Sequence, residues 1–244
     1  MSRLRNLSLF LVLAAVWGSA FVAIKAGLEY FPPVLFAAFR YDVAGVVMLA
    51  YAAYAVDDPI PRGRDAWLEV LSGAVFIIAA YHAFLFVGET DPAVTSAVAA
   101  VIVSLSPLLT TVFARAFLPA ERLTAVGAVG LAIGLVGAVV LANPDPANLT
   151  GGGTVAKLLV LLAAASFALG SVLSRASEAD IAIETMEAWA MLLGAGLTHL
   201  VSLALGESVA DATWTTESLL ALGYLSVVAS GLGFLIYFDL LDRL

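Results

Sequence analysis

Eight apolar stretches, each long enough to cross a lipid bilayer, dominate this sequence. A membrane-spanning helix needs about 20 apolar residues. Here 62% of the residues are hydrophobic and 12% are charged, against about 45–50% and about 25% in an average soluble domain. The sequence therefore predicts an all-α, polytopic transmembrane helix bundle in the cell membrane, surrounded by the lipid bilayer. The predicted spans cover residues 7–27, 33–55, 67–88, 92–115, 123–142, 154–174, 187–206 and 216–240.

The basic residues predict the orientation of these spans, because cytoplasmic segments carry an excess of Lys and Arg. With the N-terminus inside, both termini are cytoplasmic, and the outer segments hold only Lys25 and Lys157. Lys25 is close enough to the outer end of its span to snorkel to the interface as an anchor, and a solute contact is the alternative. The inner segments hold Arg3, Arg5, Arg62, Arg64, Arg115, Arg122, Arg175 and Arg243.

The first predicted span raises the question of a signal peptide. It follows two arginines and contains the small-residue stretch "GSA" at 18–20, which resembles a cleavage site. The apolar run continues to Ala26, however. We therefore expect an uncleaved first span.

Several residue types and motifs that catalytic, metal and phosphate sites need are absent or scarce in this sequence. The chain has no cysteine, which excludes disulfides, thiolate nucleophiles and Cys-based metal sites. Two histidines, His82 and His199, are too few for an all-His metal site. No glycine-rich phosphate loop lies on a cytoplasmic segment. We therefore expect no metal, no other cofactor and, for this acidic chain, no nucleic-acid partner.

The charge balance is acidic, with 19 Asp and Glu against 11 Lys and Arg. Such a surface suits high external salt, in which repulsion is screened and carboxylates hold water and cations. The composition favours a halophilic archaeon as the source. Incidental acidic loops from a GC-rich genome are the alternative.

The sequence divides into two similar halves. Residues 143–153, "NPDPANLTGGG", read as an external linker, in which Asn148 fits an N-glycosylation acceptor. "LAAVWGSAFVAIK" at 13 resembles "LAAASFALGSVLSR" at 162, and "YHAFLFVGETD" at 81 lies about 152 positions before "GFLIYFDLLDR" at 233. Two similarities at nearly the same offset predict an internal repeat, as in many secondary transporters.

A repeat unit of five spans, an odd number, would make the second copy inverted relative to the first. Two such units need ten spans, and about eight are found. The predicted division is a first five-helix repeat over 1–142, the external linker over 143–153, and a second repeat over 154–244 that is truncated after three helices.

Five motifs in a specific order resemble the EamA family of the drug/metabolite transporter superfamily. They are "AAVWGSAFVAIKAGL", "FPPVLFAAFR", "SLSPLLTTVFARAFLPAERLT", "GAVGLAIGLVGAVVL" and "LGYLSVVASGLGFLIYFDLLDRL". The resemblance covers nearly all of the chain and implies ten helices in two inverted repeats. This chain departs from the pattern in lacking a ninth and tenth helix, and in Asp42, where the family usually continues apolar.

The resemblance implies a secondary transporter of small organic metabolites, such as amino acids, acting as an exporter. A buried arginine fits this substrate class, because its planar fork binds both oxygens of a carboxylate. The alternative is a non-transporting membrane interaction protein, or an inactive fragment that lacks the last two helices.

Two charged residues in the second span need an explanation, because a charge in hydrocarbon is costly. Arg40 lies about 10 Å and Asp42 about 13 Å below the outer end of the span. Residues two apart on a helix point about 200° apart, so these charges cannot share one face. Phe36 and Ala44, one turn from Arg40, offer no partner, so any partner must come from another helix. At its depth Asp42 suits proton coupling.

Aromatic and polar side chains at similar depth predict a substrate pathway beside Arg40. Tyr81 and His82 lie about 10 Å below the outer end of the third span, and Trp17 and Ser19 lie midway along the first. The EamA resemblance adds weight to Trp17 and Arg40. The structural alternatives are that His82 is a satisfied helix-bonding histidine and that Arg40 holds two helices in register.

The fourth span contains Pro107, which removes the hydrogen bond to the Val103 carbonyl and should kink the helix. Ser104, Pro107 and Thr111 fall on one face. Hydroxyls there either satisfy the freed carbonyls or line the pathway.

The fifth span carries a stripe of small residues that we expect to pack against another helix. Packing within the monomer is favoured, and homodimerisation is the alternative. The stripe consists of Gly127, Gly130, Gly134 and Gly137.

Two other membrane functions are disfavoured. For a serine protease, "WGSA" around Ser19 lacks the second glycine of the usual motif, and no carboxylate–histidine pair is evident by spacing. A retinal photoreceptor requires a lysine deep in a late span, and no lysine follows Lys157. We predict no catalytic residue.

Overall fold

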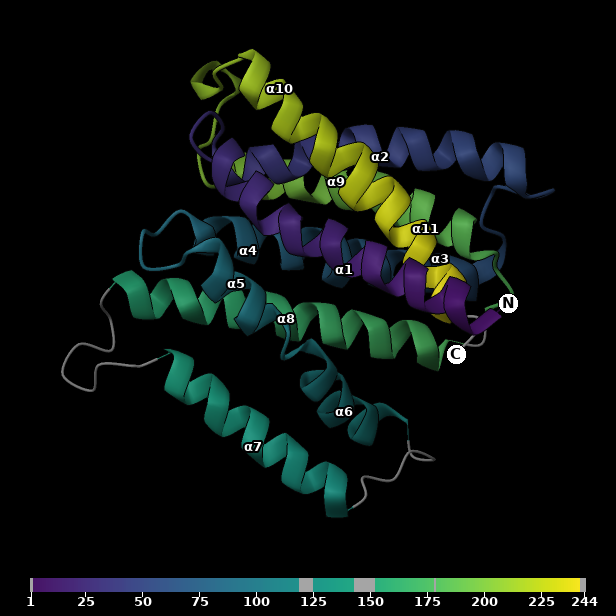
Figure 1. The fold of residues 1–244 in the computed structure, drawn as a ribbon. Helices are drawn as coiled ribbons and strands as arrows, with labels where there is room; N and C mark the ends of the chain where they lie inside the picture. Colours follow the sequence, from purple (N-terminus) through teal and green to yellow (C-terminus); the bar gives the residue numbers. More distant parts are fainter. Residues whose placement is uncertain (1, 119–124, 143–151, 178, 242–244) are drawn as a thin grey trace.

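The computed structural model describes residues 2–118, 125–142, 152–177 and 179–241, and in them all regular structure is helical (Figure 1). Each of the eight predicted apolar stretches forms one long helical segment, so the predicted helix bundle is confirmed. The segments are α1 (Ser2–Gly27), α2 (Pro33–Ala55), α3–η1–α4 (Gly63–Ser72, Gly73–Ala80, Tyr81–Glu89), α5–α6 (Ser96–Val103, Ser106–Phe117), α7 (Ala125–Ala142), α8 (Gly152–Ala176), α9 (Ile183–Ala204) and α10–η3–α11 (Thr216–Gly223, Tyr224–Leu232, Gly233–Leu241).

Seven of these segments are long and apolar enough to cross a membrane among the residues described. The eighth is α7, whose side chains are described only in part. Besides these segments, the described chain has one short 3-10 turn, Val209–Asp211, between α9 and α10.

The long segments alternate in direction, so their connections gather at two ends of the bundle (Figure 1). The terminal end holds the start of α1 and the end of α11, where Arg5 pairs with Asp239 at 3.2 Å. The loop end holds residues 28–32, 90–95 and 205–215. Two termini on the same side agree with the predicted topology, and the side that faces the cytoplasm stays a prediction. Arg122 and Arg243 lie outside the described residues.

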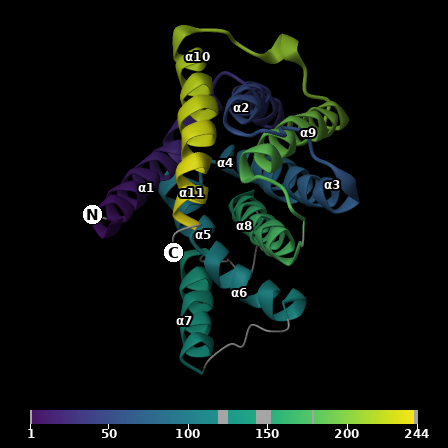
Figure 2. The ribbon, with the colours of Figure 1, turned by 90° about the vertical axis from the view of Figure 1, so that its right-hand side faces the viewer.

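Corresponding helices of the two halves pack in corresponding ways. In the first half α1 packs along α10–η3–α11, and in the second half α8 packs along α3–η1–α4. The second helix of each half, α2 and α9, pack against each other (Figure 2). An inverted repeat would require this arrangement. The repeat boundaries stay a prediction, and residues 143–151 of the proposed linker lie outside the described residues.

A π-helical segment interrupts the third helix of each half. These segments are η1 and η3, whose first residues, Gly73 and Tyr224, lie about 151 positions apart, close to the offset of the sequence repeat. A π-helix is rare and is often found at functional sites, because its shifted hydrogen bonds widen the turn. Neither segment was predicted from the sequence.

The fourth segment breaks where Pro107 predicted a kink. Helix α5 ends at Val103 and α6 begins at Ser106, with Pro107 in its first turn. The hydroxyl of Ser106 donates to the Val103 carbonyl at 2.7 Å, and that of Ser104 donates to the Val101 carbonyl at 2.6 Å. Hydroxyls therefore satisfy carbonyls at this break, one of the two roles considered, although the Val103 carbonyl is bonded by Ser106 and not by Ser104 or Thr111.

Helix α7 lies at the edge of the bundle beside α6 (Figures 1 and 2). A β-carbon on Gly134 would meet the side chain of Leu108, whereas one on Gly130 or Gly137 would meet nothing within 4 Å. Within this chain, Gly134 thus lies against α6. Packing of the whole stripe against another helix stays a prediction.

Glycines allow the central helices to approach closely, which matters in a membrane, where packing replaces hydrophobic burial as the main attraction between helices. On α9, a β-carbon at Gly194 would overlap Ile78 and lie 3.1 Å from the carbonyl oxygen of Ala74. Both neighbours belong to η1. Two residues further on, on the opposite side of α9, Gly196 is exposed, and a β-carbon there would meet nothing within 4 Å.

We expect Gly194→Leu to destabilise the protein by about 3 kcal/mol or more, because the added side chain must displace the η1 backbone. The measurement is the unfolding midpoint of purified protein in detergent. Gly196→Leu is the matched control on the same helix and should leave the midpoint nearly unchanged. Equal midpoints for the two variants would contradict the described α9–η1 contact.

Candidate functional site

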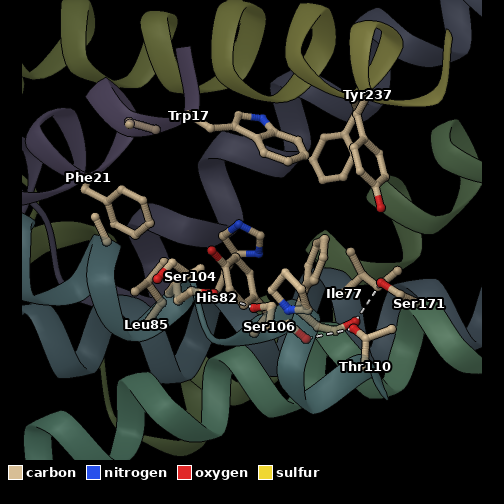
Figure 3. A pocket seen from close by; sticks show the side chains of 18 of the residues that line it. Trp17, Phe21, Ile77, His82, Leu85, Ser104, Ser106, Thr110, Ser171 and Tyr237 are labelled. Carbon is tan, nitrogen blue, oxygen red and sulfur yellow. Dashed lines mark hydrogen bonds between the residues drawn. The ribbon is translucent and has the colours of Figure 1, made fainter. Parts of the chain in front are cut away.

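A cavity of about 850 Å³ lies between the two halves of the chain (Figure 3). It begins near the loop end at Ile24 and Leu85 and reaches the terminal end at Ser174 and Arg175, in the last turn of α8. Trp17 and Tyr237 lie on one wall in Figure 3, and Ser104, Ser106 and Thr110 lie on the opposite wall, with His82 between them. The cavity thus runs along most of the bundle.

Aromatic rings form much of the wall on the α1 and α11 side. The ring of Trp17 lies 5.6 Å from that of Phe234 and 5.2 Å from that of Tyr237. The indole Nε1 donates to the carbonyl oxygen of Ala229 at 3.1 Å, in the π-helical segment η3. A β-carbon on Gly233 would lie 2.6 Å from that nitrogen, so a glycine there permits the contact.

Arg40 lines the cavity from α2 and is 5% exposed. Its Nε donates to the hydroxyl of Ser230 at 2.9 Å, and its guanidinium carbon lies 5.2 Å from the centre of the Tyr41 ring. Ser230 belongs to η3, which confirms that the partner comes from another helix. Among the described residues, no carboxylate forms an ion pair with Arg40. A buried charge with one neutral partner can bind an anionic group.

His82 is fully bonded at the centre of the cavity wall. Its Nδ1 lies 2.9 Å from the carbonyl oxygen of Ile78 and its Nε2 lies 2.8 Å from the hydroxyl of Tyr41. Because a carbonyl only accepts, Nδ1 carries the proton, so in the neutral ring Nε2 accepts from Tyr41. The bond to Ile78 is the helix-bonding role considered as the structural alternative. His82 also lines the cavity, so both descriptions apply.

The charge of the cavity wall is opposite to that of the chain. The described lining residues include two arginines, Arg40 and Arg175, and no aspartate or glutamate. The chain as a whole has a formal net charge of −8. The wall therefore favours an anionic group over a cationic one.

Six of the eight predicted pathway residues line the cavity, and their role in transport stays a prediction. The six are Trp17, Arg40, Tyr81, His82, Ser104 and Pro107.

The other two, Ser19 and Asp42, lie elsewhere. The Ser19 hydroxyl lies 2.6 Å from that of Tyr224 and bonds to the Ala15 carbonyl of its own helix. The Asp42 carboxylate lies 2.8 Å from Nε2 of His199 on α9. Asp42 and Arg40 point to different sides of α2, as their spacing predicted.

Several lining residues were not predicted. One of them, Ser171, had a sequence signal, because Gly170 and Ser171 match Gly18 and Ser19 in the predicted repeat. The remainder lie within the motifs quoted above, but nothing in those motifs singled them out as residues that line a cavity. The main ones are Ser106, Thr110, Phe167, Arg175, Phe234 and Tyr237.

The described residues contain no cluster of three or more His, Cys, Asp and Glu side chains that could hold a metal ion. The polar side-chain groups of the cavity wall are hydroxyls, two guanidinium groups, one imidazole and the indole N–H of Trp17. These groups can bind and orient a solute by hydrogen bonding and charge.

Comparison with known proteins gives consistent matches. Residues 5–143 match the EamA-like transporter family. The chain is 30% identical over 215 residues to the inner membrane transporter YedA of Escherichia coli (strain K12), covering 88% of this chain and 67% of YedA. It is 30% identical over 227 residues to a "Probable terminal-alkyne amino-acid exporter" of Streptantibioticus cattleyicolor, covering 92% of this chain and 72% of the exporter. A solved structure described only as a protein aligns with a TM-score of 0.68 at 26% identity, over 96% of this chain and 78% of that one.

The contact between Arg40 and Ser230 gives a stability prediction. Ser230→Ala leaves a buried guanidinium N–H without its acceptor, which should cost about 1–3 kcal/mol. Ser226→Ala is the control on the same π-helical segment, because the Ser226 hydroxyl bonds to the Leu222 carbonyl of its own helix at 2.7 Å. Thermal unfolding in detergent should therefore show a larger loss for Ser230→Ala. A larger loss for Ser226→Ala would argue against a structural role for the Arg40 contact.

Proposed function

Because the chain belongs to the EamA-like transporter family, we propose that it is a secondary carrier that exports small organic solutes bearing a carboxylate, such as amino acids or related metabolites. The cavity between α1, α2, α4, α5–α6, α8 and α11 is the proposed binding site. Its volume of about 850 Å³ falls in the range of sites for small molecules, about 300–1,000 Å³.

The observation that supports this proposal most directly is the buried charge of Arg40 in the cavity wall. An arginine inside the hydrocarbon region costs at least about 2.5 kcal/mol on insertion scales unless a partner offsets the cost. Its described partner is one serine hydroxyl, and the described cavity wall has no carboxylate. A solute carboxylate would supply the missing negative charge and bind both arms of the fork.

The aromatic wall suits the rest of such a solute. Trp17, Phe234 and Tyr237 offer ring faces on one side, and the hydroxyls of Ser104 and Thr110 lie opposite. An apolar side chain would pack on the rings, and an amino group would bond to the hydroxyls.

Export is the proposed direction. The cavity reaches the terminal end of the bundle, which the arginine distribution predicts to be cytoplasmic. A relative named as an amino-acid exporter supports the same direction.

In reconstituted vesicles loaded with a panel of amino acids and organic acids, Arg40→Leu should lower the transport rate by at least about 30-fold, or about 2 kcal/mol. Arg40→Lys should recover part of the rate, because it restores the charge without the fork. Arg62→Leu is the matched control, since Arg62 is exposed at the terminal end and pairs with Asp58.

Gel filtration checks that each variant remains folded. Transport at the parental rate by Arg40→Leu would assign the residue a structural role and move the search for the site to Trp17 and His82. No transport of any solute by the parent would favour the alternative of a non-transporting membrane protein.

Topology gives a separate prediction. Fusions after Leu244 should leave a reporter that works only outside the cytoplasm inactive, and fusions after Asn148 should activate it. The expectation follows from the excess of arginine at the terminal end and the two lysines, Lys25 and Lys157, at the loop end. The opposite pattern of activity would reverse the proposed orientation.

A further inference from the structure

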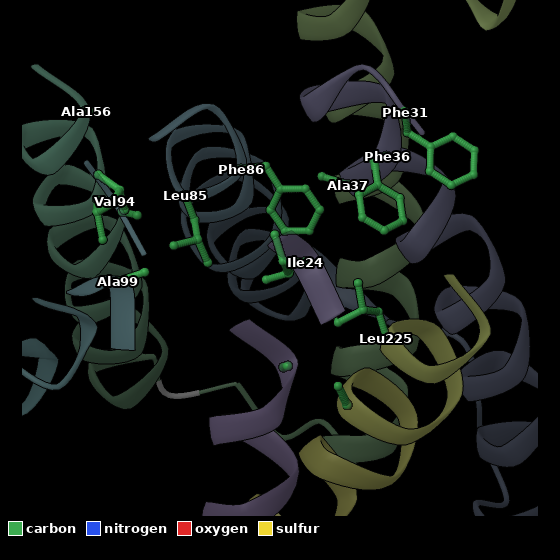
Figure 4. Close-up of a cluster of buried hydrophobic side chains, with 14 of the residues drawn as sticks. Ile24, Phe31, Phe36, Ala37, Leu85, Phe86, Val94, Ala99, Ala156 and Leu225 are labelled. Atoms are coloured by element: carbon green, nitrogen blue, oxygen red, sulfur yellow. The ribbon is translucent and has the colours of Figure 1, made fainter. Parts of the chain in front are cut away.

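The loop end of the cavity is closed by a cluster of buried apolar side chains (Figure 4). Ile24 of α1 and Leu85 of α4 line the cavity and also belong to this cluster. Phe36 and Phe86 lie beside them, with ring centres 5.4 Å apart, and both are fully buried. We call this cluster the loop-end plug. A solute in the cavity cannot reach the loop end unless the plug opens.

One side chain ties α1 to the turn beyond the plug. The ammonium of Lys25, one residue after Ile24, donates to the carbonyl oxygens of Glu89 at 2.5 Å, Asp91 at 3.2 Å and Val94 at 3.1 Å. An ammonium has three N–H groups, so these three bonds use all of them. Lys25 therefore holds the last turn of α1 against the α4–α5 turn.

Glu89, at the end of α4, lies beside this contact, and the environment of its side-chain carboxylate is unusual. The side chain is 0% exposed, and neither carboxylate oxygen accepts a hydrogen bond from any described group. The nearby Lys25 bonds to the backbone carbonyl of Glu89 rather than to its carboxylate. A buried, unbonded carboxylate is too costly to persist, whereas a neutral carboxylic acid is tolerated. The geometry thus calls for a proton on Glu89 while the plug is closed.

Few other charged groups approach Glu89 from the surrounding helices. On the elements packed against α4, the titratable residues near the loop end are Lys25 of α1, Asp91 of the following turn and Lys157 of α8. Tyr81 lies deeper on α4 itself. Helix α2 brings none before Arg40, and α5 and η1 contain none. Lys25 is therefore the natural partner for a Glu89 carboxylate.

We propose that Glu89 is a proton-binding site whose occupancy controls the opening of the loop end. With the proton bound, Lys25 holds the three carbonyls and the plug is closed. When the α4–α5 turn moves away, water reaches Glu89, the carboxyl O–H bond breaks, and the proton passes to water. The Lys25 ammonium leaves the carbonyls and pairs with the new carboxylate. Building on the proposed carrier function, this makes the proton the coupling ion.

A proton fits this site better than a metal cation. A sodium ion would need several oxygen ligands at once. The three carbonyls that could join the Glu89 carboxylate already accept from Lys25. A second positive charge beside this ammonium would also be repelled.

The absence of cysteine in the chain allows a direct test. Ser104→Cys places a reporter in the cavity, and Val209→Cys, on the exposed 3-10 turn at the loop end, provides a reference for the reagent itself. A membrane-impermeant maleimide is added at the loop-end face of oriented vesicles. The measured quantity is the labelling rate of Ser104→Cys divided by that of Val209→Cys, between about pH 5 and about pH 9.

In the parent background this ratio should rise several-fold with pH, because loss of the proton opens the loop end. Glu89→Gln, which resembles the neutral acid, should keep the ratio low at every pH, and Glu89→Asp should restore the rise. Lys25→Met should raise the ratio at every pH. Lys157→Met, the matched control on the other lysine, should behave as the parent does.

A ratio that does not change with pH in the parent would overturn the proposal. The same holds if Glu89→Gln keeps the rise, or if sodium at constant pH produces it. If Glu89→Gln does not elute as the parent does in gel filtration, Glu89→Asp takes its place. The proposal requires that the labelling ratio of Glu89→Asp rises with pH. The assay needs no solute, so an absence of transport overturns the proposed function and leaves this result standing.

Discussion

One constraint governs this structure: in hydrocarbon, each polar group must find its partner within the protein. The π-helical segment η3 meets this requirement for two helices at once. Trp17 of α1 bonds to the Ala229 carbonyl, and Arg40 of α2 bonds to the hydroxyl of the next residue, Ser230. These two contacts fix the last helical segment against the first two. Segment α5–α6 forms the cavity wall opposite Trp17 and Tyr237.

The parts of the fold that follow from local signals were predictable. A span shows itself by about 20 apolar residues, and Pro107 marked the break between α5 and α6 because proline removes a backbone donor. The π-helical segments leave no such signal. Segment η1, "GAVFIIAA", has the composition of any apolar span, and a shift of one residue in backbone bonding changes no side chain. The close approach of Gly194 to η1 could not be predicted either, because the two lie far apart in the sequence.

The candidate site was predictable where helix geometry alone decides it. The depth of Arg40 and its direction away from Asp42 follow from the rise and turn of a helix. The hydrogen-bond partners of the site residues could not be predicted from helix geometry, because they lie far away in the sequence. His82 bonds to Tyr41, 41 positions away, and Asp42 bonds to His199, 157 positions away. Depth in one helix cannot tell which residue of another helix lies opposite.

The chain has a negative net charge, whereas the described cavity wall carries positive charge. This difference connects the observations on α2 and on the cavity. Helix α2 carries both charges, but it presents only Arg40 to the cavity and turns Asp42 toward His199. A solute that enters from the terminal end passes Arg175 in the last turn of α8 before it reaches Arg40. Because a charge acts more strongly in a low dielectric, the deeper arginine exerts the larger pull. On the proposed function, a carboxylate is drawn inward step by step, whereas a solute with only a positive charge is repelled at both arginines.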